Sequence, residues 1–379
     1  MNIAVIFGSR SVEHDVSITS AYGVMKGLEK MGTHTIFPIY ISRSGKWIYD
    51  KNFINIETFA HYNDENYKDT SFEIDFSVSK KLCFSQKRKG LFTKKEKIEI
   101  DFVFPILHGM NGEDGSIQGI FDILQVPYMG PSVLGSALGM NKIVMKNVFK
   151  SLGLPITNYL IFDKNNYDAT KVEILGFPII VKPANLGSSI GISKVEKKED
   201  LADAVELAFH YDQNIIIEVC VQNLVELNCA VSEKDNEVIT SLVEQPVGAS
   251  EFLSFEEKYV SNEGGTMQGV KNRVKIPAEI SDELTKQIQN YSKIIYKEFF
   301  CHGGAPRIDY LYDKVNDKLY VNEINTIPGA LQMHLWVKSM PISDFLSNLI
   351  KVGFEKAKDK EINIDFQSNI IGHTINFTK

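Results

Sequence analysis

The chain has 379 residues, of which 44% are hydrophobic and 23% charged, a composition typical of a globular protein with two or three domains. A net charge of −7 argues against a nucleic-acid partner, and no apolar run approaches the roughly 20 residues that cross a bilayer, so no membrane partner is expected. The four cysteines are scattered without a CxxC pair, which favours a reducing cytoplasm and excludes a cysteine-rich zinc cluster.

The N-terminal segment has the pattern of a doubly wound parallel sheet. Residues 2–7 form an apolar run typical of a buried strand, helical spacing of apolar residues predicts a helix over 18–31, and residues 35–41 predict the next strand. A strand-helix-strand unit of this length requires parallel strands. Residues 100–107 predict another buried strand, whereas most of 45–100 is polar with basic runs and is interpreted as surface elaboration.

Two loops of this segment follow predicted strands. The loop at residues 8–17 carries Glu13, and the loop at residues 108–115 begins with His108. Ligands of doubly wound sheets collect at the carboxyl ends of the strands, so both loops are candidate binding elements. For His108, a direct role and a purely structural, hydrogen-bonded role are equally open.

Residues 129–132 indicate a domain boundary, and a different pattern follows it. A helix is predicted over 140–151, strands over 176–183, 192–195 and 215–218, and a second helix over 200–210. Residues 219–221 after the last of these strands resemble a hinge. No internal repeat and no low-complexity tract is present.

The loop Gly187–Gly191 lies between two predicted strands. It lacks the Lys-Ser/Thr ending of a P-loop, and no helix follows it as a dinucleotide-binding fold requires. A glycine-serine hairpin still suits phosphate, because glycine allows close backbone approach and N–H and hydroxyl groups donate hydrogen bonds. Lys182, at the end of the preceding strand, can then reach phosphate oxygens. The alternative is a plain glycine-serine turn.

Near the C-terminus, residues 305–312 and 319–325 predict a β-hairpin centred near Asn316. Alternation places Arg307 and Asp309 on one face with Leu311, and Val321 and Glu323 on one face with Asn325. Asp309 then lies across from Glu323, and a divalent cation would relieve the repulsion. The oxygen set Asp309, Glu323 and Asn325 suits Mg²⁺ better than Zn²⁺. A solvated acidic hairpin is the alternative.

Four motifs occur in one order along the chain: GSRSVEHDVS at 8–17, HGMNGEDG at 108–115, VKPANLGSSIG at 181–191 and NEINTIPG at 322–329. They are similar to the patterns GGxSxEHxVS, HGxxGEDG, VKPxxxGSSxG and NEINTxPG, with Ser9 in place of the second Gly of the first pattern, so the chain resembles the D-alanine–D-alanine ligases of the ATP-grasp superfamily. The resemblance implies an α/β fold, α+β in its later parts, with three domains. These are an N-terminal substrate-binding domain at 1–130, a central ATP-grasp domain at 131–219, and a C-terminal domain with lid and metal site at 220–379.

The resemblance also implies a reaction. ATP phosphorylates the carboxylate of one D-alanine, the amine of a second attacks the acylphosphate, and the dipeptide serves peptidoglycan synthesis. Implied substrates are D-alanine and ATP, with two Mg²⁺ ions, or Mn²⁺ in their place, on Asp309, Glu323 and Asn325. The family also implies a cytoplasmic homodimer.

Residue roles follow from the matched positions. The implied catalytic residues are Glu13, Ser188, Tyr259, Arg307 and Gly329. Those implied to bind the nucleotide are Lys142, Lys182, Ser189, Glu218, Val221, Glu226 and Lys258. The implied substrate-binding residues are Glu13, His108, His334 and Leu335. Residues 252–269 resemble the family's mobile lid, which would exclude water from the acylphosphate.

Two departures bear on the second substrate. The lid reads Leu-Ser-Phe at 253–255 where many relatives have Tyr-Asp-Tyr, and the usual Met/Phe-Thr and Ser are absent after Gly329. His334 is therefore either a pocket residue or a surface residue, and D-serine, D-lactate or another acceptor stays open. A nucleotide-binding regulator without turnover is disfavoured by Arg307 and the lid, and a carboxylase by the Glu13 loop. The tail after Glu361 is unassigned.

Overall fold

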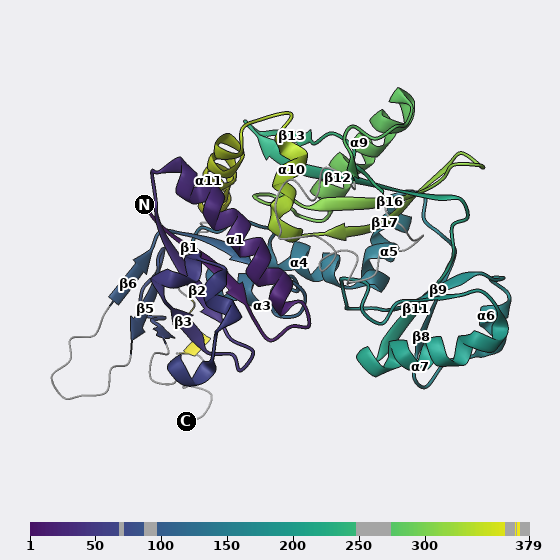
Figure 1. Ribbon diagram of the computed structural model, residues 1–379, viewed down its shortest axis with the longest axis horizontal. Helices are drawn as coiled ribbons and strands as arrows, with labels where there is room; N and C mark the ends of the chain where they lie inside the picture. The colour runs from purple at the N-terminus through teal and green to yellow at the C-terminus, as the bar shows by residue number, and fades with distance from the viewer. Residues whose placement is uncertain (68–71, 87–96, 248–273, 361–367, 369, 372–379) are drawn as a thin grey trace.

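The computed structural model describes residues 1–67, 72–86, 97–247, 274–360, 368 and 370–371. The predicted lid, with Lys258 and Tyr259, lies outside these residues, as does most of the C-terminal tail. Figure 1 shows three main sheets: the N-terminal sheet on the left, the C-terminal sheet on the upper right, and the central sheet below it on the lower right. None of the helices in the described ranges combines the length and hydropathy needed to span a bilayer.

The N-terminal sheet confirms the predicted parallel architecture. Its strand order is β3-β2-β1-β7, with β1 parallel to both β2 and β7 and with β3 antiparallel at the edge. Alternate residues of β1 face opposite layers: Val5 packs in the cluster that contains α1, and Ile6 in the cluster that contains α3. The elements are β1 (Asn2–Gly8), α1 (His14–Met31), β2 (Thr35–Ile41), β3 (Trp47–Tyr49), β7 (Phe102–Ile106) and α3 (Ser116–Ile123).

Most of the described residues between 45 and 100 are exposed or half-buried, as expected of surface elaboration, but the prediction missed the regular structure among them. A second, antiparallel sheet of order β4-β5-β6 lies here, and Phe53, Leu82 and Phe84 are buried in the two core clusters. These elements are short, and their buried residues alternate with charged ones, as in the strand KIEI, so the average polarity concealed them. They are η1 (Lys51–Ile54), α2 (Glu57–Ala60), η2 (Asp64–Tyr67), β4 (Phe72–Ile74), β5 (Leu82–Gln86) and β6 (Lys97–Ile100).

The central sheet is antiparallel throughout, with the order β10-β9-β11-β8. β9 and β10 flank the loop Gly187–Gly191, which confirms that this loop connects two strands. Helices on one face bury Leu201 and Ala208 against Ile215 and Ile217. The elements are β8 (Tyr159–Asp163), α6 (Ala169–Glu173), β9 (Ile179–Pro183), β10 (Ser193–Val195), η3 (Lys198–Asp200), α7 (Leu201–Tyr211) and β11 (Asn214–Val219).

The C-terminal sheet has the order β13-β12-β16-β17, with β16 and β17 forming the predicted hairpin. The predicted boundaries put residues 133–151 in the central domain, but these helices pack here: Met145 and Phe149 join the same core cluster as Tyr310 and Val321. The elements are α4 (Val133–Met140), α5 (Lys142–Ser151), β12 (Leu224–Lys234), β13 (Glu237–Thr240), β14 (Gln245–Pro246), β15 (Val274–Lys275), α9 (Asp282–Glu298), β16 (Arg307–Asp313) and β17 (Lys318–Asn325).

A β-bulge corrects one detail of the hairpin. Asp309 pairs with Glu323 as predicted, but the register then shifts so that Tyr310 pairs with Val321. Val321 is therefore fully buried in the core and does not share a face with Glu323. A bulge inserts one extra residue into a strand and turns the following side chains to the other face.

The chain after β17 returns to the N-terminal sheet. Ala330, Leu331 and Gln332 all have φ near +50°, a run of left-handed backbone that kinks the chain directly after Gly329. Trp336 and Leu349 are then buried in one cluster with Val5, so the first and last domains share a core, and Figure 1 shows α11 beside α1. The elements are η6 (Gly329–Gln332), α10 (Met333–Trp336) and α11 (Ile342–Asp359).

Candidate active site

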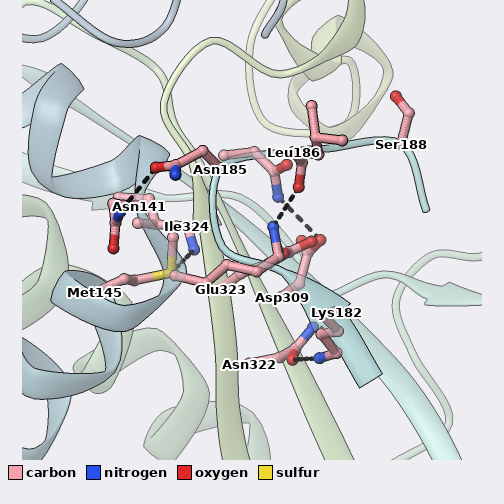
Figure 2. Close-up of polar contacts among 12 residues, drawn as sticks. Asn141, Met145, Lys182, Asn185, Leu186, Ser188, Asp309, Asn322, Glu323 and Ile324 are labelled. Atoms are coloured by element: carbon pink, nitrogen blue, oxygen red, sulfur yellow. Dashed lines mark hydrogen bonds and ion pairs between the residues drawn. The ribbon is translucent and has the colours of Figure 1, made fainter. Parts of the chain in front are cut away.

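The β16–β17 hairpin brings the predicted metal ligands together. Asp309 and Glu323 face each other across the hairpin, and Asn325 donates a hydrogen bond from Nδ2 to Asp309 Oδ2 at 3.0 Å. Figure 2 shows Asp309 and Glu323 with Leu186 and Ser188 of the glycine-serine loop on one side and Lys182 with Asn322 on the other. Within the described ranges no three His, Cys, Asp or Glu side chains gather as metal ligands. The predicted set differs from such a group because it consists of two carboxylates and one amide.

Cations neutralise both carboxylates. Arg307 binds Asp309 through two hydrogen bonds, from Nε at 2.5 Å and from Nη2 at 2.6 Å. Lys142 Nζ lies 3.4 Å from Glu323 Oε2 and donates to the carbonyl oxygen of Leu186 at 2.6 Å. Lys142 is the first residue of α5, where the Asn141 side chain caps the helix, so the helix start directs this ammonium between loop and hairpin.

A second charged group lies on β11. The carboxylate of Glu218 is 2% exposed and has two lysines beside it: Lys146 Nζ is 3.4 Å from Oε1, and Lys182 Nζ is 3.3 Å from Oε2. Burial alone would raise the pKa of Glu218, but the two ammonium groups and the hydrogen bond from Thr157 outweigh it and hold the pKa at about 2. Glu218 is therefore ionised at neutral pH, and its Oε1 accepts no hydrogen bond within the described chain.

The glycine-serine loop contacts the N-terminal domain. Ser188 and Ser189 have left-handed φ values of 53° and 60°, and Ser188 Oγ donates a hydrogen bond to Glu13 Oε1. Glycine is required at position 109, because its φ is +69° and a Cβ there would lie 2.6 Å from Glu13 Oε2. The carboxylate of Glu13, 5% exposed, is thus held between two loops that the sequence analysis singled out.

Glu113 is a residue of the site that the sequence analysis gave no role. Its Oε2 accepts from the backbone N–H of Gly109 at 2.9 Å and its Oε1 from that of Ile327 at 3.1 Å, so it connects the N-terminal loop to the end of the hairpin. Burial and the nearby charge of Glu13 raise the pKa of Glu113 to about 8. The only signal in the sequence was its place in the motif at residues 108–115.

His108 is enclosed beside Glu113. It is 4% exposed, and its Nε2 lies 2.9 Å from Ser20 Oγ. Burial lowers the pKa of His108 to about 4, so the imidazole is neutral near pH 7. These contacts explain a structural role, and its contact with a substrate stays a prediction.

The segment after Gly329 carries the remaining substrate-binding predictions. His334 Nε2 lies 3.1 Å from Glu244 Oε2, and Glu244 is buried next to β14, a partner that no local sequence pattern indicates. Leu335 is fully buried in the core cluster shared with α1, and its contact with a substrate stays a prediction.

Val221 and Glu226 lie where the chain passes from the central to the C-terminal sheet. Val221 follows β11, and Glu226 on β12 pairs with Leu311 of β16. Together with Glu218 near the end of β11, they lie close together in the sequence around the connection between the two sheets. The predicted nucleotide site uses all three residues. Their contacts with a nucleotide stay predictions, and the described residues do not include the predicted lid residues.

The fold and site define a class. A central antiparallel sheet whose glycine-serine hairpin faces an acidic hairpin of a second sheet, with buried lysines between them, is the arrangement of ATP-grasp enzymes. The solved D-alanine–D-alanine ligase of Coxiella burnetii has this fold, with a TM-score of 0.78 over 100% of this chain and 99% of that one, at 24% identity.

Family comparisons identify the particular branch. Residues 2–131 match the model described as "D-ala D-ala ligase N-terminus", and residues 148–345 that described as "D-ala D-ala ligase C-terminus". The D-alanine–D-alanine ligase of Caldicellulosiruptor bescii is 37% identical over 95% of this chain and 97% of its own length. That of Thermosipho melanesiensis is 37% identical over 98% of both chains. The chain belongs to the D-alanine–D-alanine ligase family, whose members are ATP-dependent ligases.

One solved relative is a ligase that takes a different second substrate. The VanG D-Ala:D-Ser ligase of Enterococcus faecalis superposes with a TM-score of 0.74 over 93% of this chain and 99% of that one, at 33% identity. Likeness at this level is therefore compatible with more than one second substrate.

Proposed function

We propose that this enzyme joins two D-alanines into D-alanyl-D-alanine for peptidoglycan synthesis, with conversion of ATP to ADP and phosphate. The observation that carries the proposal is the pair Asp309 and Glu323, which face each other on the hairpin and are each balanced by a cation. Facing carboxylates beside a glycine-serine loop are suited to a nucleotide whose phosphates arrive with divalent cations.

The residues present are suited to binding ATP. Glu218 Oε1 is a buried acceptor without a hydrogen bond from the described residues, and it would accept from the adenine amine. Glu226 would accept from the ribose hydroxyls and Val221 would contact the base. Phosphate oxygens would be bound by Lys142, Lys182 and Ser189, with Lys258 from the lid.

The hairpin also fits magnesium. Two carboxylates and an amide oxygen form the hard-oxygen donor set that Mg²⁺ prefers, and Mn²⁺ accepts the same ligands. We infer that Asp309, Glu323 and Asn325 hold two such ions, which when bound neutralise charge on the β- and γ-phosphates. Lys142 forms an ion pair with Glu323, and Arg307 forms one with Asp309. Each carboxylate would therefore bind both its cationic side chain and the metal.

The residues of the chain would carry the reaction as follows. Glu13 binds the ammonium group of the first D-alanine, and Ser188 and Tyr259 hold Glu13 and the loop in place. The carboxylate of that D-alanine attacks the γ-phosphorus of ATP, which forms the acylphosphate and ADP. The amine of the second D-alanine then attacks the carbonyl carbon and phosphate leaves. Arg307 and the Gly329 N–H stabilise the negative oxygen of this tetrahedral stage.

The second substrate would meet His334. Glu244 Oε2, 3.1 Å from His334 Nε2, would hold the ring in place, and a cationic imidazole there would attract the acceptor's carboxylate. His108 and Leu335 would border the same space. An acceptor such as D-serine is the second candidate, because the VanG relative is 33% identical and the usual residues after Gly329 are absent. D-lactate or another acceptor would give a further sister ligase.

We also propose the domain boundaries, the oligomeric state and the cellular location. The three domains would divide near residues 130 and 219, with helices α4 and α5 packed on the C-terminal sheet. A homodimer in the cytoplasm is proposed from the family resemblance.

The test is phosphate release from ATP with a panel of D- and L-amino acids and D-lactate, followed by product masses. The proposal predicts release with D-alanine alone and the mass of D-alanyl-D-alanine. Release only with a mixed pair of substrates would identify a sister ligase. No release with any pair would identify a nucleotide-binding regulator.

A further inference from the structure

Lys146 is a buried cation that the reaction described above does not use. Its side chain is 2% exposed, and its Nζ lies 3.4 Å from both Glu218 oxygens and 3.4 Å from Thr157 Oγ1. It lies one helical turn after Lys142 on α5 and so points to the same side of the helix. Enclosed by Glu218 and Thr157, it is not placed to touch a nucleotide phosphate.

Glu218 has one lysine more than its charge requires. One carboxylate faces two ammonium groups, and the second of these, Lys182, also donates to Asn322 Oδ1 of the hairpin at 3.3 Å (Figure 2). Lys182 thus bridges Glu218 and the hairpin, whereas Lys146 has its partners on Glu218 and Thr157. If Lys182 turned to a phosphate and no other cation were present, Glu218 would be a buried carboxylate without a counter-ion, which is strongly unfavourable.

We propose that Lys146 is the permanent counter-ion of Glu218 and a positioning residue for nucleotide binding, because it leaves Lys182 available for phosphate. The inference rests on the proposed function, since it requires that Lys182 binds the phosphates of ATP. Met145 and Phe149, on the core side of α5, are buried in the C-terminal cluster and fix the position of Lys146. Lys146 acts through Glu218 and does not itself touch the substrate.

Lys146→Met tests this with a non-hydrolysable ATP analogue in isothermal titration calorimetry. Glu218 would then keep Lys182, so analogue affinity and the KM for ATP should worsen by about tenfold or more. The kcat at saturating ATP and the KM for D-alanine should stay within about threefold of the wild type. Lys146→Arg should restore most of the affinity. Lys150→Met, which removes an exposed lysine one turn further along α5, is the matched control.

A double variant separates the counter-ion role from simple support of the fold. Removing the charge of Glu218 in Lys146→Met/Glu218→Gln frees Lys182 and retains an acceptor oxygen, so the double variant should bind the analogue more tightly than Lys146→Met. If Lys146→Met does not fold, the double variant is compared with Glu218→Gln. Affinities within about threefold of each other support the proposal. A further loss of about tenfold overturns it, because Lys146 would then act other than through Glu218.

Measurements on the wild-type enzyme distinguish a failure of the proposed function from a failure of the proposed role of Lys146. Wild-type enzyme that binds the analogue and releases phosphate with D-alanine supports the proposed function whatever the variants show. If the wild-type enzyme binds the analogue but the double variant binds it as weakly as Lys146→Met does, only the proposed role of Lys146 is overturned. Wild-type enzyme that fails to bind the analogue overturns both.

Discussion

Replacing Glu323 by glutamine tests the cation-binding role of the hairpin most sharply, because it removes one charge and preserves the shape of the side chain. Lys142 Nζ shows how strongly a cation is attracted here: it lies 3.4 Å from Glu323 Oε2. At that separation a unit charge interacts with about 5 kcal/mol at an effective dielectric constant of about 20. The Glu323 side chain is 27% exposed, so solvent screening reduces this to about 3 kcal/mol. A loss of about 3 kcal/mol of transition-state stabilisation lowers kcat/KM by about 10²-fold.

The assay is phosphate release with D-alanine across a Mg²⁺ titration, together with thermal unfolding of the same samples. Glu323→Gln should need more Mg²⁺, keep a low rate at saturation and unfold near the wild-type temperature. Glu237→Gln removes an exposed glutamate from β13 of the same sheet and should behave as wild type. Near-normal rates with an unchanged Mg²⁺ requirement in Glu323→Gln would remove this residue from the metal site.

Three further predictions concern the first substrate, the second substrate and the shared core. Burial and the charge of Glu13 raise the pKa of Glu113 to about 8. A substrate ammonium bound at Glu13 would lower the pKa of Glu113 and so release the proton of its carboxyl group. The kcat/KM for D-alanine should therefore rise with pH toward about 8. Glu113→Gln should flatten that profile, and an unchanged slope would contradict the assignment. His334→Ala should lower kcat/KM for the acceptor by about tenfold or more, with the KM for ATP unchanged, as measured by initial rates over both substrates; equal effects on both would argue against an acceptor contact. Trp336→Ala should lower the free energy of unfolding by about 3–5 kcal/mol in chemical denaturation, since Trp336 is fully buried and stacks on Phe345; a change below about 1 kcal/mol would mean that the shared core is not formed.

Local patterns were enough to predict the parts of the fold that local chemistry determines. The apolar run at residues 2–7 and the helical spacing after it predicted the first strand and helix, and the hairpin predicted the pairing of Asp309 with Glu323. The bulge at Asn322 was not predictable, because the register shift depends on Val321 being buried in the same core cluster as Met145 and Phe149 of α5, which are distant in the sequence. The described strands between residues 45 and 100 were missed because each is only three to five residues long.

The parts of the site that the sequence did not reveal depend on contacts between distant residues. Glu113 reaches the N–H of Ile327, Glu244 reaches His334, and Lys146 reaches Glu218. Each pair joins separate elements, so no spacing rule within one segment can indicate it. Lys146 illustrates the point, because on its helix it reads as an ordinary lysine, and only the fold shows that it is buried with a carboxylate.

The central claim is that the γ-phosphoryl group of ATP passes to the carboxylate of a D-alanine at this hairpin. The most direct measurement uses D-alanine labelled with ¹⁸O in both carboxyl oxygens and mass analysis of the released phosphate. Attack by the carboxylate on phosphorus followed by loss of phosphate transfers one labelled oxygen, so the account predicts one ¹⁸O atom in each phosphate formed with the dipeptide. Dipeptide accompanied by unlabelled phosphate would contradict it.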